Sequence, residues 1–282
     1  MTRRQELQRH LDTLNDLSSI LTAMKNLALV EMRKLARLRA HHEHVVHTIT
    51  RAARDFLAHH PALAPPRAAG PGVLLAIGSE RGFCGNFNEL VRAAAAAFRA
   101  RNPLAIVVPV GSKLISHVQA EAGSARLEGA SAAEEVPAVL IRTLAALQDA
   151  QPRGQGAGLN LWAAYHDMDQ GAVRVEEITS IRPQAGQPAE FPTPPVVNMD
   201  PERFLAELIE QHLFALLTRI FYSSLMAENR FRLAHMETAT RRIESRAEDM
   251  TRRRNILRQE EVTQEIELIV LSAEALEDTP KP

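Results

Sequence analysis

The residues of this 282-residue chain that could do chemistry lie mainly in one loop, Gly78–Gly85, which reads Gly-Ser-Glu-Arg-Gly-Phe-Cys-Gly. A glycine-rich loop that follows a buried strand can hold a phosphate with its backbone N–H groups. This loop lacks the Gly-x-x-x-x-Gly-Lys-Ser/Thr spacing of a P-loop, and it also lacks the Gly-x-Gly-x-x-Gly spacing of dinucleotide sites. We therefore favour a tight turn between a strand and a helix. A nucleotide-binding α/β enzyme with a coiled-coil arm is kept as the alternative.

Two further groups could act as a nucleophile or bind a metal. Cys84 is the single cysteine, which excludes a disulfide framework and a cysteine-based zinc site. No histidine lies near it in the sequence, so we do not expect a catalytic thiol. Four histidines between His41 and His47 surround Glu43 at helix-face spacing, but a solvated helix face is favoured over a metal site. We expect no catalytic residue, cofactor or metal in this chain.

The composition describes a globular protein with no strong charge bias. The 33 Lys and Arg residues nearly cancel the 34 Asp and Glu residues, so net charge gives no general attraction to nucleic acid or membrane. No run of 18 apolar residues is present, which argues against a spanning helix. The basic start at Arg3 and Arg4 is soon followed by Glu6 and Asp12, a pattern that fits neither a secretory nor a transit signal. A cytosolic or membrane-peripheral protein is expected.

Helix-breaking residues divide the chain into three segments. All 13 glycines lie between Gly70 and Gly186, and none of the 16 prolines falls in residues 1–60 or 202–279. Glycine and proline destabilise helix interiors, so these long spans predict long helices. We expect an N-terminal coiled-coil helix over 1–60, an inserted α/β domain with Pro-rich linkers over 61–201, and a C-terminal coiled-coil helix with a short tail over 202–282. Asp200-Pro201-Glu202 suits a helix start.

A heptad repeat supports the coiled-coil interpretation of the N-terminal segment. Apolar residues that recur every seven positions, and again three residues later, are typical of a left-handed coiled coil. The first set is Leu7, Leu14, Leu21, Ala28, Leu35, Ile49 and Phe56, and the second is Leu17, Met24, Leu38, Val45 and Ala52. His10, Glu31 and His42 interrupt the pattern.

The C-terminal segment carries the same spacing with one stutter. Its two runs are Leu213, Ile220, Ala227 and Ala234, then Met236, Ile243, Met250 and Leu257. An isolated helix of this length gains little stability from propensity alone, so the two segments are expected to pair antiparallel. If residue 60 faces about residue 205, equal rise places Met1 opposite about residue 264. The residues beyond that point are apolar nearly all round and are expected to be buried by other subunits: Ile266, Leu268, Ile269, Val270, Leu271, Ala273, Ala275 and Leu276.

The middle segment alternates strand and helix patterns. The expected strands are Val73–Ile77, Ala105–Val108, Leu159–Tyr165 and an edge strand over Val173–Ile181, and the expected helices are Phe87–Arg101, Gly111–Ala122 and Ala133–Asp149. Strands that alternate with helices predict a small parallel or mixed, Rossmann-like sheet covered on both faces.

Three patches in this order resemble the gamma subunit of F-type ATP synthases, the central rotor stalk. The first is Ile20–Ala28, with an Ala-Met-Lys triplet at Met24 and Lys25, followed by Met32-Arg33-Lys34. The second is Ser79–Gly85. The third is Asn255–Ile266, which closes in Ala273–Leu276. Between the second and third patches, residues at family spacing are Glu228, Arg232, Met236, Ala239 and Thr240. Glu31 departs from the family, which has lysine there, and Leu268 stands where the family usually has a carboxylate.

The resemblance implies a non-catalytic chain that transmits torque between a membrane c-subunit ring and a catalytic ring of alpha and beta subunits. The epsilon subunit would join it on the c ring. It would be a peripheral protein on the cytoplasmic face of the bacterial plasma membrane, without insertion into the bilayer. Met24 and Lys25 would meet the acidic lever of the beta subunits, and a polar catch inside the ring would comprise Arg258, Gln259, Thr263, Gln264 and Glu265. The apolar residues of the C-terminus would form the bearing.

The arginine run Arg252–Arg254 suits an acidic protein partner by charge and geometry, although a solvated helix face would carry the same residues. For Met24, ordinary packing in the heptad seam is the alternative to a subunit contact. A coiled-coil arm that binds nucleic acid is disfavoured. Acidic residues such as Glu248 and Glu260 are interleaved with the arginines, and no aromatic stacking platform accompanies them.

Overall fold

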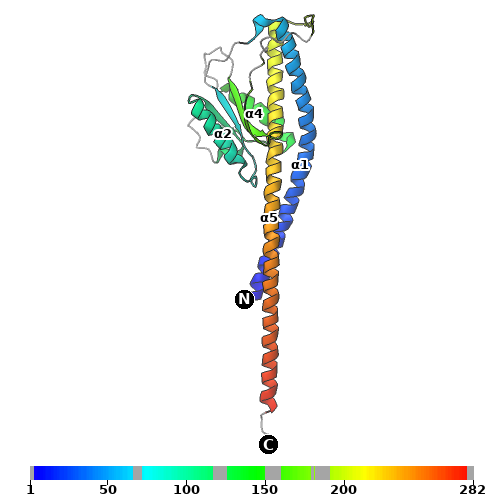
Figure 1. The fold of residues 1–282 in the computed structure, drawn as a ribbon, viewed down its shortest axis with the longest axis vertical. Helices are drawn as coiled ribbons and strands as arrows, with labels where there is room; N and C mark the ends of the chain where they lie inside the picture. Colours follow the sequence, from blue (N-terminus) through cyan, green and yellow to red (C-terminus); the bar gives the residue numbers. More distant parts are fainter. Residues whose placement is uncertain are drawn as a thin grey trace. The chain divides into compact units, whose positions relative to one another are not determined.

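The computed structural model describes residues 3–65, 72–116, 126–149, 160–178, 181 and 191–277, with the side chains of the last range described as far as Leu271. Two long helices, α1 (Arg3–His59) and α5 (Pro201–Glu277), begin and end this part of the chain (Figure 1). The chain forms two compact units. One comprises 1–27 with 234–282, and the other comprises 28–233.

The first unit contains the start of α1 and the second half of α5. Its ion pairs and hydrogen bonds run in opposite directions along the two helices: Arg4 with Glu261, Gln8 with Arg254, and Lys25 with Glu237. The two segments are therefore antiparallel, and Arg4 pairs close to the position predicted from equal rise. Leu11 and Met236 are the most deeply buried apolar residues of this unit.

The second unit is built on a four-stranded mixed sheet in the order β2-β1-β3-β4. Its strands are β1 (Val73–Ile77), β2 (Ile106–Val110), β3 (Leu161–Asp167) and β4 (Ala172–Glu177). The first three are parallel to one another, and β4 joins β3 as an antiparallel edge strand. The predicted mixed sheet is confirmed. The predicted third strand is shifted, since β3 reaches Asp167, and Leu159 lies outside the described residues.

Helices cover both faces of this sheet. Helix α2 (Phe87–Arg101) packs on the face that carries Leu74 and Ala76. The other face, with Leu75 and Ile77, packs on α4 (Val136–Asp149) and on α5. The shorter helices are α3 (Ser112–Ile115), η1 (Pro61–Leu63) and η2 (Ala133–Glu135). The predicted helix Gly111–Ala122 is described only as far as the end of α3 and Ser116, because residues 117–122 lie outside the described residues.

Within the second unit α5 is buried on nearly all sides. From Ala215 to Asn229 its residues are buried, with Arg219 and Met226 as the half-buried exceptions, since the sheet covers one side of the helix and α1 the other. Antiparallel pairing with α1 holds here too, as His42 packs on Tyr222 and Phe56 on Phe204. Asp200 caps α5 by accepting hydrogen bonds from the backbone N–H groups of Glu202 and Arg203, as the sequence predicted.

The heptad prediction is wrong at individual seam positions in both long helices. Leu17 was placed in the seam but is 45% exposed, whereas Leu11 is 5% exposed. In this stretch the seam residues follow the Leu7 series by four positions and not by three. Ala52 is likewise exposed, and its neighbour Ala53 is buried. In α5 the Met236 run lies in the seam, whereas Ala234 is exposed.

Candidate interaction surface

The helix pair of the first unit leaves apolar side chains of α5 uncovered. Arg4, in the first turn of α1, pairs with Glu261 at 3.0 Å, and α5 continues to Glu277. Beyond Glu261, Ile266 is 56% exposed, Leu268 67% and Leu271 61%. Val270 and Ile269 are also exposed. The backbone of Leu276 belongs to α5, but its side chain lies outside the described residues. The described part of the predicted bearing is thus a helix surface of large apolar side chains open to a partner.

The predicted polar catch lies on this same exposed stretch of α5. Its five side chains are exposed: Arg258, Gln259, Thr263, Gln264 and Glu265. Thr263 Oγ1 donates a hydrogen bond to the backbone carbonyl of Gln259 at 2.9 Å, one turn earlier. The polar residues lie mainly before Ile266, and the large apolar residues lie from Ile266 onward. We call Arg258–Leu271 the exposed tip of α5.

The three arginines of the run Arg252–Arg254 have different surroundings. Arg252 and Arg253 are exposed, and Arg252 lies 3.9 Å from Glu248 on the same helix. Arg254 is half-buried, and its Nη1 donates a 2.9 Å hydrogen bond to Gln8 Oε1 of α1. Arg254 thus joins the two helices, while the first two guanidinium groups remain accessible.

Met24 and Lys25 lie at the edge of the helix seam. Both are half-buried, and Lys25 Nζ lies 3.0 Å from Glu237 Oε1. The hydrogen bond and charge of Lys25 lower the pKa of Glu237 below its usual range. The lysine that the resemblance assigns to an acidic partner therefore already has an acidic neighbour on α5.

An exposed apolar stripe next to Met24 was not predicted. Leu17 is 45% exposed, Ile20 55% and Leu27 61%. These residues are three and seven positions apart, a spacing that places them on one helix face beside the seam. The signal was present in the sequence. It was missed because Leu17 had been placed in the buried heptad.

In the second unit, the Gly78–Gly85 loop contributes the carboxylate of Glu80, which lies at the carboxyl ends of β1 and β2. The carboxylate of Glu80 accepts hydrogen bonds from Ser112 N at 2.9 Å, Ser112 Oγ at 2.5 Å and Gly129 N at 2.7 Å. Burial alone would raise the pKa of Glu80, but these hydrogen bonds and the Lys113 charge hold it below its usual value. The carboxylate occupies donors of the kind that a phosphate would use.

The geometry of this loop is that of a tight turn. Phe83 and Gly85 both have positive φ, at 63° and 57°. Cys84 is buried, and its Sγ donates to Ser79 Oγ at 3.3 Å. Burial raises the pKa of the Cys84 thiol, which disfavours the thiolate that a nucleophile would need.

Two residues that the resemblance marked, Glu228 and Arg232, tie this loop to α5. They form a buried ion pair one helical turn apart, and Arg232 also donates to Gly82 O at 3.4 Å and Asn229 Oδ1 at 2.8 Å. Burial raises the pKa of Glu228 to about 7, although Arg232 and the backbone N–H groups of Arg81 and Glu80 pull it down. These residues of the family pattern act here as a structural tether.

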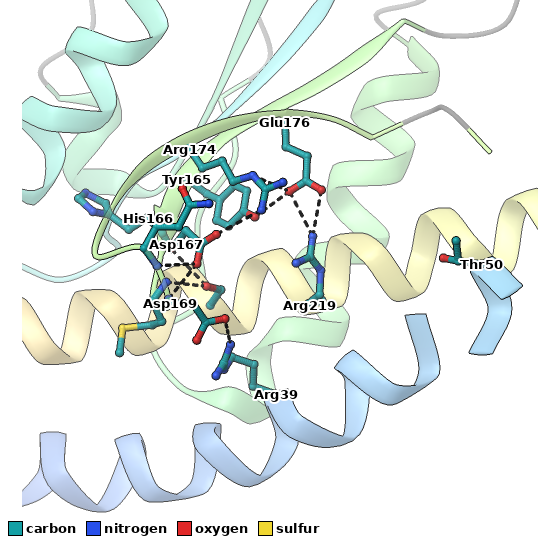
Figure 2. A network of polar contacts seen from close by, with 12 residues as sticks. Arg39, Thr50, Tyr165, His166, Asp167, Asp169, Arg174, Glu176 and Arg219 are labelled. Carbon is teal, nitrogen blue, oxygen red and sulfur yellow. Dashed lines mark hydrogen bonds and ion pairs between the residues drawn. The ribbon is translucent and has the colours of Figure 1, made fainter. Parts of the chain in front are cut away.

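A second polar cluster attaches the β3–β4 hairpin to both long helices (Figure 2). In the hairpin turn, Asp169 Oδ2 accepts a 2.7 Å hydrogen bond from Arg39 Nη1 of α1. On β4, both carboxylate oxygens of Glu176 lie within hydrogen-bond distance of Arg219 Nη2 of α5, at 3.3 and 3.2 Å. Tyr165 of β3 donates to Glu176 at 2.8 Å. The sequence does not reveal this cluster, because Arg39 and Arg219 are far from the hairpin along the chain.

The histidine cluster does not form a metal site in the described residues, where no three potential ligands come together. His42 is half-buried against Tyr222, and its pKa is lowered by burial and by the neighbouring His41. His41, His44 and His47 are exposed. His42 therefore packs in the seam against α5, which corrects the predicted solvated face at this position, whereas the other three histidines lie at the surface.

The chain is similar to known proteins of an ATP synthase family. The family model described as ATP synthase matches residues 3–276. A curated relative, the ATP synthase gamma chain of Bdellovibrio bacteriovorus, is 31% identical over 99 residues, which is 35% of this chain. The matched region spans about a third, 34%, of that relative's length.

Solved structures share the fold at low identity. A chain of the Euglena gracilis mitochondrial ATP synthase, from a structure of OSCP, F1 and the c-ring, aligns over 97% of this chain and 94% of its own length, with a TM-score of 0.60 and 13% identity. A chain from the central stalk and c-ring of the Tetrahymena thermophila mitochondrial ATP synthase covers 78% of this chain and 99% of its own, with a TM-score of 0.55 and 16% identity.

Proposed function

Since the chain belongs to the gamma-subunit family of ATP synthase, we propose that it is the central rotor stalk of an F-type synthase, the subunit that transmits torque. It would connect an ion-translocating c-subunit ring with a catalytic ring of alpha and beta subunits, and an epsilon subunit would accompany it. In this role the chain couples ATP synthesis or hydrolysis to ion transport and carries no active site of its own.

The exposed tip of α5 is the observation that carries the proposal. Large apolar side chains such as Leu268 and Leu271 stay exposed after the helix has left its partner α1. Transfer of such side chains out of water stabilises an assembly by about 1.5–3 kcal/mol each. A sleeve formed by other subunits would bury them and would bring Arg258, Gln259, Thr263, Gln264 and Glu265 into contact as the polar catch.

A rotor biases its neighbours only if each orientation contacts them differently. The surface of the first unit is uneven in this respect. The stripe Leu17, Ile20 and Leu27 is apolar, whereas Arg252 and Arg253 on α5 are cationic and exposed. Met24 and Lys25 lie beside the stripe, and we assign them to the contact with the beta subunits. In a ring of alternating subunits this asymmetry would favour one conformation of a catalytic subunit at a time.

The location that follows is a peripheral one, on the cytoplasmic face of the bacterial plasma membrane. None of the helices in the described ranges is long and apolar enough to cross a membrane. In the proposed complex the chain would meet the membrane through the c ring.

The alternative, a nucleotide-binding α/β enzyme, is disfavoured by the Gly78–Gly85 loop. Glu80 takes up donors at the strand ends, and the raised pKa of Cys84 keeps it a thiol. A titration of the isolated chain with ATP and ADP separates the two functions. The rotor predicts no saturable binding, and the enzyme predicts a measurable affinity.

Co-expression with the alpha and beta subunits tests the rotor directly. We expect the chain to co-purify with them as one complex, and a chain that ends before Thr263 to assemble and couple poorly while nucleotide binding by the ring is unchanged. Full assembly and coupling by the shortened chain would contradict the assignment of catch and bearing.

A further inference from the structure

We infer that the β3–β4 hairpin is the joint through which the sheet-bearing unit transmits torque to the two long helices, and that Arg39–Asp169 and Arg219–Glu176 are its two locking pairs. The inference rests on the proposed rotor function and specifies how force passes within this one chain. All four residues belong to the second compact unit.

The joint requires contacts that resist sliding. Interdigitated apolar side chains resist sliding by steric fit, but the hydrophobic contribution itself is non-directional and depends chiefly on the area removed from water. Charge-assisted hydrogen bonds are directional and lose energy when the donor leaves its axis. A unit that pushes sideways on a helix pair therefore needs polar contacts in addition to its apolar core.

The two locking pairs provide such contacts on different helices. Arg39 belongs to α1, and its Nη1 lies 2.7 Å from Asp169 Oδ2 in the hairpin turn. Arg219 belongs to α5, and its Nη2 contacts both oxygens of Glu176 on β4 (Figure 2). With one pair on each helix, the hairpin can neither slide along a single helix nor pivot on it without breaking a polar contact.

The hairpin is itself braced, so force at one pair reaches the other. Arg174 lies 3.4 Å from Asp167 and 3.6 Å from Glu176, and Tyr165 donates to Glu176 at 2.8 Å. Asp167 Oδ1 accepts from the backbone N–H of Asp169 at 2.9 Å, which fixes the turn. Ser223 of α5 accepts from the backbone N–H of Met168 at 3.2 Å and donates to His166 O at 3.3 Å. The hairpin therefore presents a preformed set of partners to the helices.

The face of β4 that meets the long helices carries polar side chains, whereas its other face is apolar. Val173 and Val175 point to the α2 side of the sheet, whereas Arg174 and Glu176 alternate with them and face the long helices. Apolar side chains would have sufficed to cover the sheet. Instead the side chains of Arg219 and Glu176 are only 15% and 20% exposed, and water competes weakly for such a pair.

The test uses the assembled synthase in inverted membrane vesicles and measures ATP hydrolysis together with ATP-driven ion pumping. Arg39→Glu places two acids opposite each other, and Asp169→Arg places two bases there. We expect each single variant to hydrolyse ATP at the parental rate but to pump roughly threefold less per ATP, the population shift expected from loss of one partly exposed pair. The double variant Arg39→Glu with Asp169→Arg restores an opposite-charge pair and should recover pumping.

The inner pair is tested with Arg219→Lys, which keeps the charge but loses the planar fork, and with Arg219→Gln, which loses both. We expect pumping per ATP to fall in the order parent, Lys, Gln. The destabilised control is Leu57→Ala, a buried residue of α1 whose apolar cluster contains no residue of β3 or β4. If it lowers the melting temperature as much as Arg219→Gln but pumps normally, the loss belongs to the joint and not to general stability.

The outcomes are distinguishable. If the parental chain fails to assemble with alpha and beta subunits, the proposed function is wrong. If it assembles and couples, but the charge reversals and Arg219→Gln pump as well as the parent, the rotor assignment stands and the joint is overturned. The joint is also overturned if the double charge reversal pumps no better than the single ones.

Discussion

Arg4 of α1 and Glu261 of α5 form an ion pair at 3.0 Å although 257 residues separate them in the sequence. The pair shows where the first turn of α1 meets α5. Beyond this pair, α5 exposes the large apolar side chains that another subunit would cover in the proposed rotor.

The first prediction concerns this exposed tip. The double variant Leu268→Ser and Leu271→Ser should leave the melting temperature of the free chain unchanged, because both side chains are already more than 60% exposed. Loss of two large apolar contacts should weaken assembly with the alpha and beta subunits roughly a hundredfold. Quantitative pull-down with purified subunits measures this. The matched control is Leu104→Ser, which is 82% exposed in the second unit and should assemble normally.

The second prediction follows from the register of the helix seam. Leu11→Ala should destabilise the first unit by about 2–4 kcal/mol, because Leu11 is 5% exposed and its removal leaves a cavity. Leu17→Ala, at 45% exposure, should change stability by less than about 0.5 kcal/mol. Thermal unfolding of both variants, followed by circular dichroism, checks the order. Equal losses of stability in the two variants would support the three-residue spacing of seam residues that the sequence predicted.

The third prediction compares two glycines with positive φ. Gly111 has φ 106°, and a Cβ there would lie 2.8 Å from the carbonyl oxygens of Gly78 and Ser79. Gly171 has φ 64° and open space around it. Gly111→Ala should therefore cost about 3 kcal/mol or more, and Gly171→Ala only about 1 kcal/mol of backbone strain. Chemical denaturation gives both values, and a smaller loss at position 111 would contradict the close approach.

The fourth prediction concerns the stability of the folded chain at acidic pH. Burial, with the nearby Arg219 and Arg54 charges, lowers the pKa of His212 below its usual 6.5, and its Nε2 lies 3.1 Å from Thr50 Oγ1. The folded chain thus binds this proton less readily than the unfolded chain. The stabilising effect is present above pH 6.5 and is lost as the pH falls through the folded value. His212→Gln keeps a hydrogen-bonding group that does not titrate, so its melting temperature should fall less steeply below pH 6.5.

The fifth prediction has the opposite sign. Burial raises the pKa of Glu228 to about 7, above the usual 4.5 of a glutamate. Its stabilising effect is therefore complete below pH 4.5 and is lost as the pH rises through about 7. Glu228→Gln should remove this component, which makes the melting temperature less dependent on pH between those values. Comparison of the two variants over one pH series separates the histidine from the carboxyl contribution.

Much of the fold followed from the positions of glycine and proline. The breaker-free spans predicted α1 and α5, and equal rise along two antiparallel helices placed the start of α1 close to its observed partner Glu261. The strand patterns predicted the mixed sheet with an edge strand near Val173. These features depend on local composition, which is read directly from the sequence, and on helical geometry, which is the same in every α-helix.

The errors occurred where two interpretations of one residue compete. Leu17 and Leu11 are both leucines near the seam, and three- and four-residue spacings are equally compatible with a heptad. Glu31 interrupted the apolar pattern, but its carboxylate accepts a 2.6 Å hydrogen bond from the backbone N–H of Ala133. A sequence does not show such a partner 102 residues away.

The polar joint was missed for the same reason. Arg174 and Glu176 alternate with valines, which predicts a strand with one polar face, but that pattern usually describes a face open to water. Glu176 on this face meets Arg219 of α5, and the adjoining hairpin turn meets Arg39 of α1, so the partners come from two helices far away in the sequence. Family resemblance did not help either, since none of these four residues lies in a patch that carried it.

The carboxylate of Glu80 occupies, at this edge of the sheet, hydrogen-bond donors that could otherwise bind an anion from solution. Three donors at the strand ends are already engaged, and the low pKa keeps this side chain ionised at neutral pH. The loop is therefore held by contacts within its own chain. In the proposed rotor, this loop would keep its conformation through contacts within the chain, without a bound ligand.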